Sequence, residues 1–194
     1  MCVVSLRAVD EFSLGDIMSA SDCVLSYEKL LSAGEIGFYK DGGFEKLPLP
    51  PMLMLDRVIS ISSEGGDFGK GMIVAEQDLT PDKWFFQCHF RDFPVMPGCL
   101  AMDALWQLLG VFLSCNKVRG KMMAMGANKV SFRGMITPDI SMMSYVIHVR
   151  RLFSSGGNVI AIADGVGKSG DQELLSIEKL RVVAVGQDSE SISS

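Results

Sequence analysis

The sequence has little histidine, and its cysteines lack the spacing of a metal site. It contains two histidines and five cysteines, none of them in a Cys-x-x-Cys pair. An odd number of cysteines without this spacing argues against both a disulfide framework and a zinc ribbon. The two histidines, His89 and His148, also lie far apart in the chain. We therefore expect no metal ion and a reducing compartment.

Clusters of basic residues are also missing. The chain has 18 Lys and Arg against 23 Asp and Glu, for a net charge of −5. Proteins that bind nucleic acids neutralise phosphates with clustered Lys and Arg, so DNA and RNA are not expected partners. The first residues lack the basic start and apolar stretch of a secretory signal. These absences predict a cytoplasmic protein.

The length fits one domain with its own core. At 194 residues and 48% hydrophobic content, the chain needs no disulfide bonds to bury a core. Residues 1–25 show no hydrophobic periodicity, and we expect a flexible extension there. A single domain is predicted over residues 26–186. The polar, serine-rich residues 187–194 are expected to form a flexible tail.

The most apolar segment, residues 93–115, contains a single charged side chain, Asp103. Pro97 and Gly98 near its start indicate the beginning of a helix that runs to about Asn116. Such a helix is short for a bilayer, and a carboxyl group at the bilayer centre costs about 2.5 to 3.5 kcal/mol. We therefore predict the central helix of a soluble protein, with no membrane partner.

Short apolar segments separated by Gly, Ser, Asp and Pro are typical of strands. They occur at Met52–Ile61, Lys70–Gln77, Met122–Phe132, Ser141–Phe153, Asn158–Val166 and Leu174–Val185. In one of them, Tyr145, Ile147 and Val149 share a face, which is expected to be buried. A short helix is predicted at Ser26–Ala33, with Gly34 as its stop. The sequence thus predicts an α+β fold in which an antiparallel sheet wraps around a long central helix.

Two glycine-rich stretches do not have the spacing of phosphate-binding loops. Residues 165–169 (GVGKS) would need a glycine at the position of Ile162, and residues 65–71 lack a Ser or Thr after the lysine. We interpret the first stretch as a hairpin turn and the second as a connection between strands. Nucleotide binding is not expected.

His89 is the candidate base. It lies in an aromatic-rich stretch, Trp84–Phe90, shortly before the predicted start of the central helix. Imidazole is the side chain that most readily accepts a proton near neutral pH. The alternative is a structural histidine bonded to a backbone carbonyl. His148 lies next to Arg150 and Arg151 and is expected to be a surface residue.

Asp103 is the candidate acid, because it lies in the first two turns of the most apolar helix. Apolar surroundings raise the pKa of a carboxyl group, which can then stay protonated and donate its proton. The alternative is an ion pair with an arginine such as Arg57 or Arg133. The Gly98 N–H at the helix start has no partner in the helix and could bind a carbonyl oxygen. A base, an acid and an oxyanion donor suit the elimination of water beta to a carbonyl.

Cys99 offers a different chemistry. A thiol at a helix N-terminus can act as a nucleophile, with His89 as its base. Free cysteine is also a common small core residue, so a structural role remains the alternative.

Four segments closely resemble one enzyme family. Residues 53–58 (LMLDRV), 84–90 (WFFQCHF), 94–100 (PVMPGCL) and 102–107 (MDALWQ) are similar to bacterial 3-hydroxydecanoyl-acyl-carrier-protein dehydratases, enzymes of fatty acid synthesis with a hot-dog fold. The resemblance extends over about residues 26 to 185. Related dehydratases of broader range have glutamate at the position of Asp103 and lack the Gly-Cys-Leu turn, so the resemblance favours the decanoyl-type branch.

The resemblance implies a homodimer with active sites at the subunit interface. His89 would come from one subunit and Asp103 from the other. The Val95 carbonyl would orient His89, the Gly98 amide would bind the thioester oxygen, and Gln107 would steady Asp103. Cys99 would belong to the supporting residues of the site. No metal and no organic cofactor is implied.

The implied reaction is dehydration of a 3-hydroxyacyl-acyl-carrier-protein of about ten carbons to the trans-2-enoyl thioester. Isomerisation of trans-2-decenoyl to cis-3-decenoyl would follow. An acyl thioesterase with the same fold and a non-catalytic acyl-binding protein remain alternatives. The residues Arg91–Phe93 depart from the small turn that the family usually has. Basic side chains expected to dock the acidic carrier protein are Arg150, Arg151, Lys179 and Arg181.

Overall fold

A computed structural model of the chain describes residues 24–39 and 45–186. Within these residues the chain forms two α-helices and seven strands. In chain order they are α1 (Tyr27–Glu35), β1 (Arg57–Ser62), β2 (Met72–Asp78), α2 (Gly98–Cys115), β3 (Lys121–Gly126), β4 (Lys129–Phe132), β5 (Met142–Ser155), β6 (Asn158–Ser169) and β7 (Gln172–Val185).

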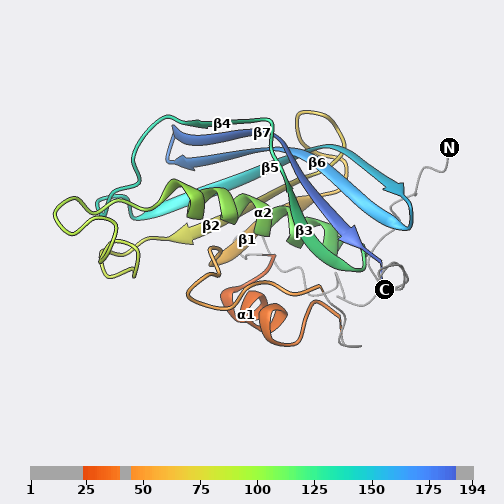
Figure 1. Cartoon of the computed structure of the whole chain (residues 1–194), viewed down its shortest axis with the longest axis horizontal. Coiled ribbons are helices and arrows are strands. Elements are labelled where there is room, and N and C mark those ends of the chain that lie inside the picture. Colours follow the sequence, from red (N-terminus) through yellow and green to blue (C-terminus); the bar gives the residue numbers. More distant parts are fainter. Residues whose placement is uncertain (1–23, 40–44, 187–194) are drawn as a thin grey trace, which may run out of the picture.

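The seven strands form one antiparallel sheet, and α2 lies along one face of it (Figure 1). The strand order is β1-β2-β5-β6-β7-β3, and β4 also pairs with β7. Helix α2 packs against β2, β5, β6 and β7. This arrangement confirms the predicted α+β architecture of a sheet wrapped around a central helix.

The central helix begins and ends where the sequence predicts. It starts after Pro97 and is followed by Asn116 at its C-terminal cap. Leu105, Leu108 and Phe112 are fully buried. By length and composition α2 could cross a membrane, but 61% of it is buried inside the fold. Its apolar composition is therefore explained by the sheet that surrounds it.

Strand β5 supplies the expected alternation. Tyr145, Ile147 and Val149 are at most 1% exposed, which confirms that they share the buried face. Tyr145 buries its hydroxyl as well, and this group donates a hydrogen bond to Gln77 Oε1 at 2.9 Å. The core between β5 and α2 therefore also contains a polar pair whose hydrogen bond is satisfied.

The strand predicted at Met52–Ile61 is shorter than expected. Strand β1 begins at Arg57, and the residues before it form no ladder. The main-chain groups of Met52 and Met54 instead bond the side chain of Gln107 on α2. These two backbone groups are therefore occupied by the helix and not by a neighbouring strand.

The strand predicted at Met122–Phe132 is in fact two strands, β3 and β4. The break occurs at Gly126, whose φ of 134° is suited to glycine, and the register with β7 shifts there. Both strands pair with β7, at different parts of its length. The predicted segment is rich in apolar residues and contains no proline, so its sequence pattern did not reveal this break.

The interpretation of residues 165–169 as a hairpin turn is wrong, because they lie inside β6. The turn comes after them, at Gly170, whose φ is 55°. Gly165 faces α2, since a Cβ built on it would lie 2.9 Å from a Leu105 methyl group. The absence of a side chain at residue 165 therefore allows β6 to pack closely against α2. Residues 65–71 connect β1 to β2, as expected.

His148 is not the plain surface residue that was predicted. Its side chain is only 18% exposed, and Nδ1 accepts a hydrogen bond from the Asp67 N–H at 3.1 Å. It therefore anchors the connection between β1 and β2. The sequence pattern showed charged neighbours on its own strand but not this loop folding over it.

The predicted N-terminal helix is confirmed as α1, with Ser26 at its N-cap. Gly34 is not its stop but lies within the helix, where a Cβ would come within 2.8 Å of the Leu49 side chain. Of the predicted N-terminal extension, Leu25 pairs with Val58 in a β-bridge, and residues 1–23 lie outside the described residues. The predicted tail, residues 187–194, lies outside them too.

Candidate active site

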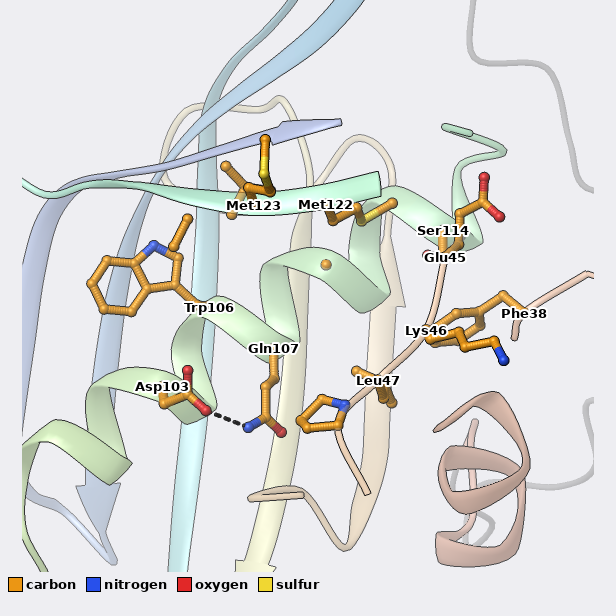
Figure 2. A pocket seen from close by; sticks show the side chains of 14 residues that line it. Phe38, Glu45, Lys46, Leu47, Asp103, Trp106, Gln107, Ser114, Met122 and Met123 are labelled. Carbon is orange, nitrogen blue, oxygen red and sulfur yellow. Dashed lines mark hydrogen bonds between the residues drawn. The ribbon is translucent and has the colours of Figure 1, made fainter. Parts of the chain in front are cut away.

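Asp103 lies in a groove beside the central helix (Figure 2). The groove has a volume of about 250 Å³ and runs between α2, strand β3 and the segment before β1. Its lining is mainly apolar. The lining residues are Phe38, Glu45, Lys46, Leu47, Pro48, Asp103, Trp106, Gln107, Gly110, Ser114, Met122, Met123, Ala124 and Val182.

Gln107, one helical turn after Asp103, hydrogen-bonds the acid. Gln107 Nε2 donates to Asp103 Oδ2 at 2.6 Å. The dashed line in Figure 2 marks this bond, and the second carboxyl oxygen points away from Gln107. Because residues four apart lie on the same side of a helix, α2 alone brings the two side chains together. This contact is the one that the family resemblance implied.

The alternative role of Asp103, an ion pair with an arginine, is not what the structure has. Arg57 Nε bonds Glu76 at 2.6 Å, and its terminal nitrogens bond Asp78. Arg133 bonds Glu173 at 2.6 Å. Among the described residues, Asp103 has no ion-pair partner. Its carboxyl group is therefore not neutralised by a neighbouring cation.

The surroundings of Asp103 favour its protonated form. Burial among apolar side chains raises the pKa of its carboxyl group, and the hydrogen bond from Gln107 opposes this only in part. Asp103 is half-buried, so one part of the carboxyl group still meets the groove. A group of this kind can donate a proton to a molecule lying there.

His89 lies at the end of a series of turns before α2 and is half-buried. Its Nδ1 is 2.8 Å from the Val95 carbonyl oxygen, and the Val95 N–H donates to the His89 carbonyl at 2.7 Å. The imidazole also stacks on the Phe90 ring at a centroid distance of 4.1 Å. A ring nitrogen facing a carbonyl oxygen must carry the proton, so Nε2 is the nitrogen that can accept one.

Gly98 opens α2, and its N–H has no hydrogen-bond partner among the described residues. A Cβ built on Gly98 would lie 2.5 Å from the Phe132 ring. The missing side chain therefore makes room for an aromatic ring of β4, which the sequence did not predict. Phe132 is 56% exposed. Its partly exposed ring thus lies against the start of the helix.

Cys99 is exposed in the first turn of α2. Its thiol takes part in no hydrogen bond within residues 24–39 and 45–186, and His89 is engaged with Val95. In the part of the chain that the structure describes, no contact favours its activation as a nucleophile. The described residues also hold no group of three or more side chains that could bind a metal ion.

One copy of the chain does not join the predicted base to the predicted acid. His89, Val95 and Gly98 do not line the groove that holds Asp103, and no hydrogen bond between described residues links His89 to Asp103. The chain therefore carries two partial sites. One contains the acid with Gln107, and the other contains the imidazole with Val95.

Sequence reasoning missed the groups that hold Gln107. These are the Met52 carbonyl, which accepts from Nε2 at 2.8 Å, and the Met54 N–H, which donates to Oε1 at 3.0 Å. Main-chain groups are present in every residue, so only the break in the strand pattern at Pro50 and Pro51 could have hinted at them.

Comparisons with known proteins agree with this architecture. The chain resembles the dehydratase heterocomplex ApeI:P of Xenorhabdus doucetiae, with 16% identity, a TM-score of 0.53, and coverage of 72% of this chain and 87% of that one. It also resembles Cj0977, a sigma28-regulated virulence protein of Campylobacter jejuni, with 11% identity, a TM-score of 0.50, and coverage of 84% and 95%. At these identities the likeness concerns the fold alone.

The sequence identifies the family of the chain, which the structural likeness alone does not. The model of the FabA-like domain matches residues 47–178, which include β1 to β6, α2 and both partial sites. The chain therefore belongs to the family of FabA-like domains and has their hot-dog fold.

Proposed function

We propose that the protein dehydrates a 3-hydroxyacyl thioester carried by acyl carrier protein. The observation that carries this proposal is the state of Asp103. Its carboxyl group lies in a mainly apolar groove and forms no ion pair among the described residues, its pKa is raised by burial, and Gln107 holds one of its oxygens. An acid of this kind is suited to protonate a leaving hydroxyl group.

The reaction needs a base, an acid and an oxyanion donor. His89 Nε2 would take the proton from C2 of the substrate, while Nδ1 stays bonded to the Val95 carbonyl. The C2–H electron pair forms the double bond between C2 and C3 as the C3–O bond breaks. Asp103 would give its proton to the departing oxygen, and water leaves. The Gly98 N–H would bind the thioester oxygen as it gains negative charge.

The two partial sites would be joined in a homodimer. Large apolar side chains are exposed on the edge strand β3 and around the start of α2: Met123 (46%), Met125 (56%), Phe90 (56%), Phe93 (52%) and Phe132 (56%). Exposed apolar side chains of this size are typical of surfaces that bind another protein chain. In the proposed dimer, His89 of one copy faces Asp103 of the other.

We further propose that the substrate has about ten carbons and that the enzyme also shifts the double bond. Isomerisation would move the trans-2 double bond to cis-3, with His89 taking a proton from C4 and a proton returning to C2. The Asp103 and Gly-Cys-Leu residues of the decanoyl-type branch, present here at 98–100 and 103, support this part of the proposal.

The test is to incubate the full chain with 3-hydroxydecanoyl thioester and identify the products by mass spectrometry and double-bond position. We expect the trans-2-decenoyl and cis-3-decenoyl thioesters. Release of free thiol with 3-hydroxydecanoic acid would instead indicate a thioesterase. Tight binding without turnover would indicate a non-catalytic acyl-binding protein, and either result would overturn the proposal.

A further inference from the structure

Both polar atoms of the Gln107 side chain, Nε2 and Oε1, form hydrogen bonds. It is 7% exposed. Its Nε2 donates to the Met52 carbonyl at 2.8 Å and to Asp103 Oδ2 at 2.6 Å, and its Oε1 accepts from the Met54 N–H at 3.0 Å. A buried amide with three partners has one rotamer and one orientation.

The two main-chain groups decide which end of the amide meets Asp103. A backbone N–H can only donate and a backbone carbonyl can only accept. A flipped amide would set Gln107 Oε1 against the Met52 carbonyl and its NH₂ against the Met54 N–H, and both bonds would be lost. The segment before β1 therefore makes Gln107 present an N–H, never an oxygen, to the acid.

This orientation has a consequence for the proton on Asp103. An oxygen that accepts an N–H bond is poorly placed to carry a proton of its own, because donor would then face donor. We propose that the main chain of Met52 and Met54, acting through Gln107, directs the proton of Asp103 to Oδ1, the oxygen that faces away from Gln107. The inference rests on the proposed function only for the statement that a substrate hydroxyl receives this proton.

Gln107 is thus a positioning residue, and the 52–54 segment is part of the positioning device. The other charged groups lining the groove are Glu45 and Lys46, near the C-terminal half of α2. Neither is a cause of the raised pKa of Asp103, which comes from burial and is reduced by Gln107. In the proposed dimer, His89 of the second copy is the remaining titratable group that would face the acid.

The test compares Gln107→Met with a matched change at a second buried glutamine. Gln77 is 2% exposed and bonds Tyr145 and the sulfur of Met54, but it does not contact Asp103. Gln77→Met therefore makes the same chemical change in the core without touching the acid. The readout is the infrared C=O stretch of protonated Asp103, isolated as the difference between each protein and its Asp103→Asn counterpart.

In the wild type, the C=O of the protonated acid is Oδ2, which accepts the Gln107 bond. Gln107→Met should therefore move this band to higher wavenumber, and the titration of the band should move to higher pH because a donor to the carboxylate is lost. Gln77→Met should change neither. If Gln107→Met folds poorly, Gln107→Asn takes its place in the test. Its amide is one methylene too short to reach Asp103, so we expect the same two shifts.

Kinetics provide a second readout. Gln107→Met should lower kcat about 10-fold, less than the roughly 10²- to 10⁴-fold loss expected when an acid or base is itself removed, and leave KM nearly unchanged. The fall in rate at high pH should occur at a higher pH than in the wild type. An unmoved carboxyl band in folded Gln107→Met, or an equal shift in Gln77→Met, would overturn the inference. Because the band needs no turnover, its result stands apart from a failure of the proposed reaction.

Discussion

At the scale of single residues, the half-buried carboxyl group of Asp103 lowers the stability of the fold when it is ionised. Its pKa is raised by burial, so the folded state binds the proton more tightly than the unfolded state does. The carboxyl group therefore destabilises the fold increasingly as the pH rises above its unfolded-state pKa, and the cost is complete once the pH exceeds the folded pKa. A neutral side chain of the same shape would avoid this cost.

We therefore expect Asp103→Asn to abolish dehydration and to raise stability in a pH-dependent way. The gain in Tm over the wild type should be small below the ordinary pKa of an aspartate. It should grow as the pH rises from that ordinary pKa to the raised pKa and then level off. Thermal melting across this pH range measures the difference. A gain that shrinks toward neutral pH would contradict the account, as would retained turnover.

The residue types alone predicted the candidate acid, the candidate base and the start of the helix, because each of these residues is unusual among its neighbours in the sequence. An aspartate in a very apolar helix is such a case, and so is a histidine among aromatic residues. The family resemblance added Val95 and Gln107, and both lie within hydrogen-bond distance of the groups that it implied. Phe132 beside Gly98 could not be foreseen, because it comes from a distant strand.

At the scale of elements, the close contact of α2 with β6 depends on Gly165. A methyl group there would lie 2.9 and 3.1 Å from the two terminal carbons of Leu105. We expect Gly165→Ala to lower the free energy of unfolding by about 1 to 3 kcal/mol through overpacking. Leu105→Ala alone should cost about 2 to 5 kcal/mol, and the double variant should cost less than the sum.

Gly110 in α2 is the control for this prediction. A Cβ built there meets only the Met122 sulfur, at the ordinary distance of 3.7 Å. Gly110→Ala should therefore raise stability by about 0.5 to 1 kcal/mol, since alanine is the better helix former. Denaturant unfolding measures all four variants. Additive costs for Gly165→Ala and Leu105→Ala would show that the two residues do not share this contact.

The sequence predicted the elements better than their ends. Helix α2 was found almost to the residue, because proline and glycine mark its start and its apolar composition is distinctive. The ends of β1 and the break between β3 and β4 were missed. Both depend on partners distant in sequence, namely Gln107 for the residues before β1 and the register with β7 for the break.

At the scale of the whole molecule, the basic side chains expected to dock an acidic carrier protein are not equivalent. Arg150 bonds Asp164 through two nitrogens at 2.6 Å, so its charge is largely used within the fold. Arg151 is exposed and stacks on Phe153 with its charge free to meet a partner. A surface cation of this kind steers association with an acidic protein.

We expect Arg151→Glu to raise KM for carrier-bound substrate and leave KM for a small thioester unchanged. Arg150→Glu should instead lower Tm, because it would leave two carboxylates facing each other. Steady-state kinetics with the two substrate forms measures the first effect. Equal KM changes for both forms would mean that Arg151 acts on the active site and not on docking.

The central claim is that His89 of one copy works with Asp103 of another. The direct measurement mixes two inactive variants, His89→Asn and Asp103→Asn, after unfolding and joint refolding. In random dimers about a quarter of all sites would combine an intact histidine with an intact aspartate, so the mixture should regain about a quarter of the wild-type rate. A mixture of folded dimers as inactive as its components would contradict a shared site.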